Sequence, residues 1–481
     1  MPRLIVIPLI VACALFMETM DSTVIATSLP AIAKDIGENP LALKLALTSY
    51  LVSLAVFIPI SGWMADRFGA RRVFAAAIAV FMGGSLLCAA SSTLAQFVGA
   101  RFLQGMGGAM MVPVGRLVLL RSVPKRELVA MLTYLTVPAL LGPVIGPPLG
   151  GMVTLYFHWR WIFLINIPIS VIGFYLVLRF IPNIREPDMP PLDLRGFMLS
   201  GIGLSVLMLG LSALGGHLLS AEISSACIVL GALLLSGYAW HAQRNPHPLI
   251  NLALLKLPTF RAGVLGGGLF RIGVGATPFL LPLLLQIGFG LDPLQSGLLT
   301  AAVAAGALFM KTLTTTILRR YGFRTVLRVN AVASSAALAA YGLFTAATPH
   351  LIIVAVLLFS GCLRSLQFTA LGAISFADVS QPSMSQATSF SSMTQQLTQS
   401  VGVALGAYAL QLSSLLQGHH AIVAADFWPA FLAIAIISSA SLFLHAELPP
   451  DAGMEVSGHV TAGKFAQPEA QRTVKTESPS K

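Results

Sequence analysis

Charged residues are scarce in this sequence. Asp, Glu, Lys and Arg make up only 10% of the 481 residues, and hydrophobic residues make up 56%, whereas an average soluble domain has about 25% charged residues. A chain with so little charge cannot cover a water-facing surface of this size. The composition therefore excludes a soluble enzyme or binding domain and indicates an integral membrane protein.

Several chemical features are also missing. The four cysteines lie in long apolar segments, so we expect no disulfide framework. The sequence has no Gly-x-x-x-x-Gly-Lys-Ser/Thr loop, which argues against ATP-driven pumping. Its His and Cys residues show no metal-ligand spacing. We therefore expect a protein that is not an enzyme and that binds no metal and no cofactor.

Long apolar segments dominate what is present. A membrane-spanning helix needs about 20 predominantly apolar residues. Fourteen segments meet this requirement: residues 5–28, 43–64, 73–91, 95–118, 129–155, 161–180, 196–215, 223–241, 262–286, 296–318, 326–346, 350–370, 388–415 and 427–445. No segment shows the period-two pattern of an outer-membrane barrel. The predicted fold class is therefore an all-α integral membrane protein with fourteen transmembrane helices.

The distribution of Lys and Arg predicts how the chain is oriented. With the first span entering from the cytoplasm, seventeen Lys and Arg residues fall at the inner side, and only Lys34, Lys44 and Arg160 fall in the outer loops. Positive residues gather in cytoplasmic loops. We therefore expect both termini in the cytoplasm. The pI of about 9.8 then reflects membrane topology, and we expect no nucleic-acid partner.

An internal repeat divides the chain. The loop Arg67–Val73 reads Arg, aromatic, Gly, any residue, Arg, any residue, Val, and Arg320–Val326 repeats this pattern. Parallel repeats of this kind are a known transporter plan. We predict a six-helix bundle at 1–181, a linker with two extra transmembrane helices at 182–259, and a second six-helix bundle at 260–445. Residues 446–481 read as a disordered cytoplasmic tail.

Five ordered motifs resemble those of one transporter family. The loop Gly62–Arg72, Arg101–Ala109 and the Gly-Pro run Leu141–Gly151 are similar to signature motifs of the major facilitator superfamily. Asp21–Pro30 and Trp159–Pro168 resemble its subfamily of fourteen-span drug:proton antiporters. The stretches 107–117 and 270–288 further resemble a bacterial branch named for multidrug resistance. This resemblance implies two six-helix bundles plus two inserted central helices, and multidrug efflux driven by the proton motive force.

The first repeat loop is a candidate conformational latch. Asp66 stands among cations at the inner end of the second span, and Arg116 lies at comparable depth in the fourth. A charge contact there could hold one state of a rocking transporter; the alternative is inside-positive topology plus a tight glycine turn. The second copy has Arg319 where the first has Asp66, so that copy lacks the acid. The predicted latch residues are Gly62, Asp66, Arg67, Gly69, Arg71, Arg72 and Arg116.

The fifth span is a candidate hinge. Proline inside a helix removes a hydrogen bond and bends it, while glycine permits close backbone approach. This span concentrates both residue types, and the predicted hinge residues are Gly142, Pro143, Gly146, Pro147, Gly150 and Gly151. The alternative is the ordinary enrichment of Gly and Pro in transmembrane helices.

Two carboxylates interrupt the first apolar segment. Glu18 and Asp21 are three residues apart and share a helical face, and ionisable residues in a span favour a proton or ligand site. Counting about 1.5 Å per residue places Asp21 and Arg101 at similar depths, so a pair is feasible. An apolar setting favours a protonated carboxyl group and a nearby Arg favours the ionised form, which makes Glu18 the better proton carrier. The alternative is that Asp21 only braces helix packing.

The second bundle carries buried cations without acids. Arg271, Lys311 and Arg364 lie in predicted spans of this half, and none of these spans contains a carboxylate. Facing a cavity, they would form a positive wall for an anionic substrate; the alternative is that they reach the membrane interface. Polar residues could line the same cavity or hold helices together. The predicted cavity residues are Gln104, Arg271, Lys311, Arg364, Gln367, Gln395 and Gln399.

These observations lead to one functional hypothesis and two alternatives. We expect a proton-coupled transporter that exports small organic molecules across the bacterial cytoplasmic (inner) membrane by alternating access, with a small-molecule substrate, protons and the lipid bilayer as partners, acting as a monomer. One alternative is export of organic anions or metal chelates such as citrate-like acids. The other is a membrane sensor or scaffold without transport.

Overall fold

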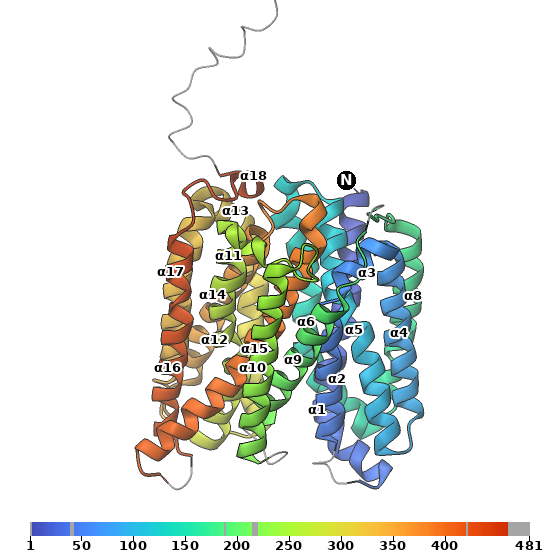
Figure 1. The fold of residues 1–481 in the computed structure, drawn as a ribbon. Coiled ribbons are helices and arrows are strands. Elements are labelled where there is room, and N and C mark those ends of the chain that lie inside the picture. Colours follow the sequence, from blue (N-terminus) through green and yellow to red (C-terminus); the bar gives the residue numbers. More distant parts are fainter. Residues whose placement is uncertain (1, 39–42, 187–188, 214–219, 420–421, 460–481) are drawn as a thin grey trace, which may run out of the picture.

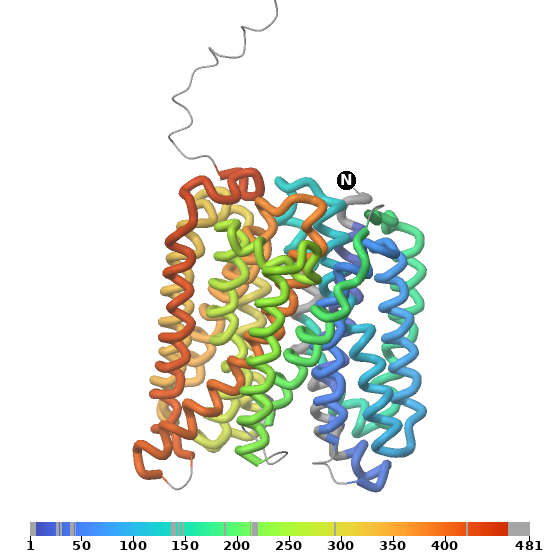
Figure 2. Tube along the Cα trace, viewed as in Figure 1, coloured from blue at the N-terminus to red at the C-terminus, as the bar shows by residue number. Residues whose placement is uncertain are grey.

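The computed structural model describes residues 2–38, 43–186, 189–213, 220–419 and 422–459, and these residues form helices without any strand. Long helices run side by side along one axis and form two bundles (Figure 1). The N-terminal end of the first helix and the last short helix lie at the same end of the molecule (Figure 1), and the tube in Figure 2 traces the chain between them. This end is called the terminal end below, and the other end the distal end.

The first bundle follows the predicted order. Its helices are α1 (Pro2–Ile36), α2 (Lys44–Phe57), α3 (Ser61–Phe68), α4 (Ala70–Ala90), α5 (Leu94–Ser122), α6 (Leu128–Tyr156), α7 (Trp161–Leu164) and α8 (Asn166–Phe180). The second span is bent by 56° between α2 and α3. The turn from α3 into α4 is made at Gly69, whose φ of 94° lies where side chains are disfavoured.

Two helices separate the bundles in the sequence. They are α9 (Leu194–Ala213) and α10 (Ala221–Arg244), which pack against each other. Helix α9 also packs on α2 of the first bundle and on α15 of the second. The inserted pair therefore lies beside the junction of the two halves, as the green ribbons in Figure 1 show.

The second bundle contains several irregular helices. Its elements are α11 (Pro258–Arg261), the π-turn η3 (Ala262–Gly266), α12 (Gly267–Leu283), the π-turn η4 (Leu284–Gly288), α13 (Pro293–Tyr341), α14 (His350–Ile374), α15 (Met384–Leu416), α16 (Phe427–Ser439) and α17 (Ser441–Ala446). Short 3₁₀ turns lie in the connections: η1 (Lys125–Glu127), η2 (Leu252–Lys256), η5 (Gln381–Ser383) and η6 (Ala424–Asp426). Together α11, η3, α12 and η4 form the first span of this half.

Helix α13 consists of two arms. The chain breaks at Gly322, where φ is 70° and ψ is 165°, and this is the glycine of the second repeat loop. Lys311 in the first arm contacts Thr369 of α14, whereas Tyr341 in the second arm contacts Ser360. From Lys311 to Tyr341 the contact point on α14 moves back from Thr369 to Ser360. The second arm therefore returns alongside α14, and the two arms are two antiparallel spans.

Most residues of each predicted span lie in helices of the structure. The span 43–64 crosses the break between α2 and α3, the span 326–346 runs past the end of α13 at Tyr341, and residues 214–215 lie outside the described part of the chain. By length and apolar composition, ten helices of the described residues could cross a membrane, or eleven if the bent pair α2–α3 counts as one span. This set counts the two arms of α13 once, and it leaves out α6 and the Ser-, Thr- and Gln-rich α15. The all-helical plan is confirmed, while fourteen spans stays a prediction.

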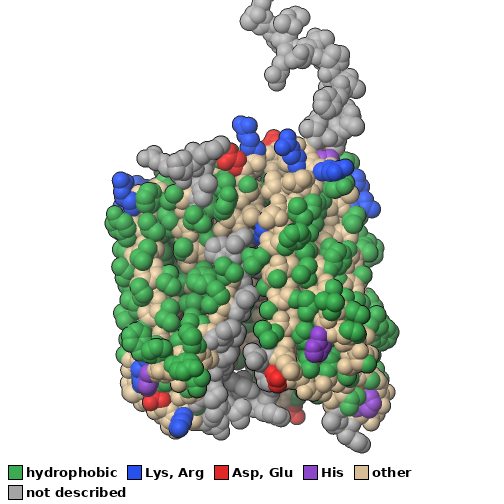
Figure 3. Space-filling model, turned by 180° about the vertical axis from the view of Figure 1, so that it is seen from behind, with side chains coloured by type: hydrophobic (Ala, Val, Ile, Leu, Met, Phe, Trp, Pro, Cys, Tyr) green, Lys and Arg blue, Asp and Glu red, His purple; other side chains and the backbone are tan. Residues whose placement is uncertain are grey.

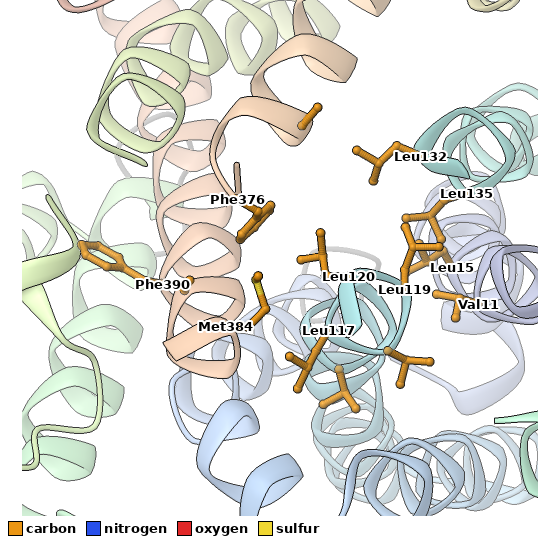
Figure 4. Close-up of a cluster of buried hydrophobic side chains, with 14 of the residues drawn as sticks. Val11, Leu15, Leu117, Leu119, Leu120, Leu132, Leu135, Phe376, Met384 and Phe390 are labelled. Carbon is orange, nitrogen blue, oxygen red and sulfur yellow. The ribbon is translucent and has the colours of Figure 1, made fainter. Parts of the chain in front are cut away.

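The apolar cores show where the two halves meet. The largest buried cluster contains residues from both halves, and Figure 4 shows Phe376 and Met384 of the second half facing Leu117 and Leu120 of α5. At the distal end each half has a separate cluster. The outer face between the two ends is covered by hydrophobic side chains, with Lys and Arg gathered toward the ends (Figure 3). The two halves are therefore joined mainly at the terminal end.

The predicted disordered tail is wrong for its first part. Residues 446–459 fold back on the terminal end and include α18 (Met454–Ser457). Leu448 and Val456 are buried there, and Glu455 pairs with Lys125 at 3.2 Å. Burial of these two apolar side chains favours the folded-back position of the segment. Residues 460–481 lie outside the described part of the chain.

Candidate functional site

Asp21 and Arg101 form a buried ion pair between α1 and α5. The Arg101 Nη1 lies 2.6 Å from Asp21 Oδ2, and each residue is 1% exposed. The other carboxylate oxygen accepts hydrogen bonds from Gln104 Nε2 at 2.9 Å and from Asn166 Nδ2 of α8 at 2.8 Å. The predicted pair is thus present. Gln104, predicted as a cavity residue, is bound to the carboxylate of this pair. Removing one partner of such a pair leaves a buried charge uncompensated.

Helix α4 completes this polar network. Ser85 accepts a hydrogen bond from Gln104 at 2.8 Å and one from Asn166 at 3.3 Å. The close approach of α4 to α5 depends on Gly84, because a Cβ there would lie 2.6 Å from the Cα of Gln104. Four helices of the first bundle therefore meet at one carboxylate. The polar residues Asp21, Ser85, Arg101, Gln104 and Asn166 are called the aspartate network below.

Glu18 lies beside this network without joining it directly. Its Oε1 accepts a hydrogen bond from the Tyr50 hydroxyl of α2 at 3.2 Å, and the side chain is half-buried. The guanidinium carbon of Arg101 lies 4.3 Å from the centre of the Tyr50 ring, a cation–π contact. The two carboxylates of α1 thus have different partners. Tyr50 contacts Glu18 itself and also Arg101, the ion-pair partner of Asp21.

Sequence reasoning missed three members of this site. Asn166 lies within the Trp159–Pro168 motif, and a lone Asn in an apolar helix is a signal that could have found it. Ser85 and Tyr50 lie in ordinary-looking spans, where a single hydroxyl gives no such signal. Their roles depend on which face of each helix turns inward, and that rotation follows from packing between helices distant in the sequence.

The partner of Asp66 differs from the predicted one. Its Oδ1 lies 3.0 Å from Nη2 of Arg121, near the end of α5, and its Oδ2 accepts a hydrogen bond from Ser385 of α15. Among the described residues, no ion pair or hydrogen bond joins Asp66 to Arg116. Arg121 lies five residues further along α5, so it reaches the terminal end while Arg116 stays deeper. The contact with Ser385 links the two halves.

Arg121 extends this contact along the terminal end. It also lies 3.4 Å from Glu186 and donates to the carbonyl oxygen of Gln381 in the second half, again at 3.4 Å. Gly62 permits the approach of the halves, since a Cβ there would lie 2.6 Å from the Ser385 carbonyl oxygen. The other predicted latch residues are Gly69 at the turn, the exposed Arg67 and Arg72, and the half-buried Arg71.

Arg116 lies half-buried on α5, within the range of charge interaction with one cation of the second bundle. It is close enough to Arg271 of α12 for charge repulsion. Arg271 is 3% exposed, and its Nε and Nη1 have no hydrogen-bond partner among the described residues. Arg271 and Arg364 both approach the Phe368 ring, at 5.8 and 5.9 Å. Arg116, Arg271, Arg364 and Phe368 are called the arginine cluster below.

The remaining predicted cavity residues divide into two groups. Lys311 donates to the Thr369 hydroxyl at 2.6 Å, and Gln367 joins Asn330 and the Leu327 carbonyl oxygen. These contacts hold α13 against α14. Gln395 and Gln399 lie half-buried on α15. No group of three or more His, Cys, Asp or Glu that could hold a metal ion occurs within the described ranges.

The predicted hinge α6 packs tightly on α1. A Cβ at Gly142 would overlap the Thr19 hydroxyl, and one at Gly146 would overlap that of Thr23. Gly150 is buried, whereas Gly151 faces open space. The helix runs from Leu128 to Tyr156 without a break. The side chains of Pro143 and Pro147 lie outside the described residues, and the hinge role stays a prediction.

A smaller charged group closes the first bundle at the distal end. The carboxylate of Asp35 accepts hydrogen bonds from Trp159 Nε1 at 3.0 Å and from Arg160 Nη1 at 2.7 Å. The hydrogen bond from Trp159, with help from the Arg160 guanidinium, holds the pKa of Asp35 below its usual value. These two donors begin the Trp159–Pro168 motif, so the motif braces α1 at one end and supplies Asn166 at the other.

A comparison with known protein families decides the identity of the fold. The family model of the Major Facilitator Superfamily matches residues 11–403, and again residues 263–462. The chain belongs to the major facilitator superfamily. It is therefore a membrane protein of a transporter family.

Relatives within the superfamily cover nearly the whole chain. The protein named "Putative multidrug resistance protein MdtD" from Serratia proteamaculans (strain 568) is 38% identical over 459 residues, which is 95% of this chain and 94% of that protein. Its namesake from Klebsiella pneumoniae (strain 342) is 38% identical over 452 residues, or 92% and 94% of the two chains. The predicted resemblance to the bacterial multidrug resistance branch is confirmed.

Solved structures of the superfamily share the fold. The human organic anion transporter MFSD10 (TETRAN) matches with a TM-score of 0.65 at 15% sequence identity, over 92% of this chain and 99% of that one. The proton:xylose symporter XylE, bound to 6-bromo-6-deoxy-D-glucose, matches with a TM-score of 0.65 at 13% identity, over 95% and 98%. At this identity the likeness shows the architecture alone.

Proposed function

We propose that this protein exports small organic molecules from the bacterial cytoplasm in exchange for protons. The observation that carries the proposal is the aspartate network, in which one buried carboxylate is held by a guanidinium and two side-chain amides. Ionisable groups at such depth in a membrane protein are costly and mark proton or substrate pathways. The multidrug resistance name of the relatives supports organic molecules as cargo.

Protonation of Asp21 supplies the coupling step. A proton on this carboxylate cancels its charge and leaves Arg101 buried without a counter-ion, which is unfavourable in an apolar interior. The bundle relieves this cost by rearranging, so proton binding drives a change in the packing of α1 against α5. Glu18, half-buried beside the network, is the second carboxylate on the same helix face and receives or passes on the proton.

The terminal-end contacts hold one state of the cycle. The positive-inside pattern of Lys and Arg supports a cytoplasmic position for this end. Asp66, Arg121 and Ser385 then hold the two bundles together at the cytoplasmic side. At the distal end each bundle has its own apolar core, so the bundles can separate there without breaking a shared core. Rocking of one bundle against the other exposes the midplane to the opposite side, which requires these contacts to break.

Export of an organic anion is the second candidate function. The arginine cluster supports it, because two buried nitrogens of Arg271 have no hydrogen-bond partner in the described part of the chain, and a carboxylate would satisfy them with charge-assisted hydrogen bonds. No Asp or Glu is present in the spans that hold these cations. A lipophilic cation, by contrast, would meet repulsion from Arg116, Arg271 and Arg364.

Flux in everted vesicles tests the proton coupling. We expect Glu18→Gln, Asp21→Asn and Arg101→Ala to lower proton-driven uptake of substrate at least tenfold. Glu222→Gln is the matched control, because Glu222 is an exposed carboxylate at the start of α10. If all three variants keep full proton-dependent flux, the antiport assignment fails and a sensor or scaffold role gains support.

A substrate screen decides between the two kinds of cargo. A lipophilic cation and a tricarboxylate are each offered to wild type, Arg271→Ala and Arg364→Ala, with the exposed Arg328→Ala as control. Anion export predicts that only tricarboxylate flux falls in the two cluster variants. Flux of the cation alone, unchanged by both variants, would contradict the anion proposal and leave drug efflux standing.

A further inference from the structure

Tyr50 connects the surroundings of the two carboxylates of α1. It is 2% exposed and lies on α2, whereas the carboxylates lie on α1 and Arg101 lies on α5. Its hydroxyl donates to Glu18 Oε1 at 3.2 Å, while its ring lies 4.3 Å from the guanidinium carbon of Arg101. One side chain therefore contacts both Glu18 and the ion-pair partner of Asp21.

Two glycines of α5 fix this position. A Cβ at Gly105 would lie 2.7 Å from the Tyr50 carbonyl oxygen, so this glycine lets the backbones of α2 and α5 approach. A Cβ at Gly108, one helical turn further, would lie 2.9 Å from the Tyr50 hydroxyl and 3.6 Å from Glu18 Cγ. Because these two glycines have no side chain, Tyr50 has room to place its hydroxyl toward Glu18 and its ring toward Arg101.

We propose that Tyr50 is a positioning residue that joins Glu18 and Asp21 into one proton-binding unit, its hydroxyl holding Glu18 and its ring holding Arg101. This inference rests on the proposed proton coupling. With Glu18 ionised, the Tyr50 O–H donates to the carboxylate and favours the ionised form. When Asp21 takes up a proton, Arg101 loses its counter-ion and turns more fully to the Tyr50 ring, which moves the hydroxyl relative to Glu18.

The charged surroundings of Glu18 support a coupled pair. The groups around Glu18 are Tyr50 on α2, which donates to it at 3.2 Å, and the 2.6 Å pair of Asp21 on its own helix with Arg101 on α5. Helix α6, which also packs on α1, has no charged residue in its sequence. Asp21 opposes ionisation of Glu18 and Arg101 favours it. Because these influences have opposite signs, small movements of Tyr50 and Arg101 decide which carboxylate holds the proton.

An infrared titration of the purified full-length protein in lipid tests the inference. The carboxyl stretching band that disappears in Glu18→Gln reports protonation of Glu18. Tyr50→Phe keeps the ring under Arg101 and deletes only the hydroxyl, so the midpoint of this band rises by about one pH unit. Gly108→Ala keeps the tyrosine but displaces its hydroxyl, and the midpoint moves in the same direction. Tyr175→Phe, on an exposed face of α8, leaves it unchanged.

The coupling itself has a separate readout. In Asp21→Asn the midpoint of the Glu18 band shifts, and combining this variant with Tyr50→Leu removes part of that shift. A Tyr50→Phe midpoint equal to that of wild type, or a Glu18 band that never titrates, overturns the inference. Proton uptake during substrate flux in proteoliposomes is measured in parallel. Wild type without proton movement overturns the proposed antiport, whereas proton movement with an unshifted Tyr50→Phe midpoint overturns only the role of Tyr50.

Discussion

Asp21 of the first bundle has a counter-ion and hydrogen-bond donors within its own bundle, whereas Arg271 of the second bundle has no counter-ion among the described residues. Asp21 and Arg101 form a 2.6 Å pair supported by Gln104 and Asn166. In the second bundle Arg271 is equally buried, yet two of its N–H groups lack partners among the described residues. A buried carboxylate that is paired within the protein suits the proposed proton handling, and a buried guanidinium without a counter-ion suits the proposed binding of an anionic cargo. We therefore expect the two copies of the repeat to have different roles in the proposed transport cycle.

The two repeat loops differ in the same way. In the first copy Asp66 contacts Arg121 and Ser385 and so connects the bundles. In the second copy Arg319 takes the place of the acid, and its carbonyl oxygen accepts a hydrogen bond from His459 of the folded-back tail at 3.0 Å. Only the first loop therefore makes a charged contact across the halves at these positions. Substitutions in the two halves test this comparison, because we expect their effects to differ.

The largest effect is expected in the aspartate network. Asp21→Asn or Arg101→Met leaves one buried charge without its partner, and we expect a loss of about 3–5 kcal/mol in the free energy of unfolding. The double variant Asp21→Asn/Arg101→Met should lose less than the sum of the two, since it leaves no charge behind. Thermal unfolding in detergent measures all three. Additive losses would show that the two residues do not act as a pair.

The terminal-end contact should be sensitive to its acid. Asp66→Asn removes the charge that Arg121 and Ser385 share, and we expect the closed state to lose roughly 1.5–3 kcal/mol. Accessibility of a cysteine introduced at Met384, which lies buried between the halves, to a thiol reagent from the terminal end should rise more than tenfold. Arg319→Ala in the second repeat copy is the control and should leave the accessibility unchanged. Equal effects in both copies would remove the asymmetry.

Helix packing gives a contrast within α6. Gly146→Ala places a methyl group against Thr23, and we expect a loss of about 1–3 kcal/mol. Gly151→Ala lies on the same helix with nothing within 4 Å of the new Cβ and should be neutral or slightly stabilising. Unfolding midpoints of the two variants measure the difference. A tolerated Gly146→Ala would show that the close approach of α6 to α1 is dispensable.

Arg271 should behave oppositely to Arg101. Because its charge is buried with no counter-ion among the described residues, Arg271→Met should raise the free energy of unfolding by about 1 kcal/mol, while export of an anionic substrate falls. The matched control Arg328→Met lies at an exposed position and should change neither property. Destabilisation by Arg271→Met would indicate a counter-ion for this residue and would weaken the comparison between the bundles.

The smallest effect concerns pH at the distal end. Asp35 has its pKa held below its usual value, first by the hydrogen bond from Trp159. Its stabilisation is therefore present at neutral pH and is lost as the pH falls through the usual range near 3.8 and below. Asp35→Asn should flatten the acid limb of the unfolding midpoint against pH. An unchanged acid limb would assign acid sensitivity to other groups.

Depth and pattern allowed part of this structure to be predicted. Apolar run lengths located the helices, and residue counts along two spans placed Asp21 and Arg101 at one level, because rise per residue is constant in a helix. Helix rotation is not given by such counts. Asn166 and Tyr50 were missed for this reason. Asp66 pairs with Arg121 and not with Arg116 because a shift of five residues changes both depth and face.

The folded part of the tail was unpredictable for a related reason. Leu448 and Val456 are isolated apolar residues in a polar stretch, and their burial depends on a surface formed by helices far away in the sequence. Gly453, with φ of 68°, turns the chain where a Cβ would meet Phe323 and Ile374. The local composition of the tail does not show that such a surface exists. A prediction from composition alone therefore favoured disorder.

Proton and substrate movement measured together test the central claim most directly. Proteoliposomes containing wild type, Asp21→Asn or Arg271→Ala are given a substrate gradient, and lumenal pH is recorded with substrate flux. We predict that Asp21→Asn moves no protons with substrate, whereas Arg271→Ala raises the KM for an anionic substrate and keeps the proton-to-substrate ratio of wild type. A normal proton ratio in Asp21→Asn would contradict the assignment of proton coupling to the first bundle.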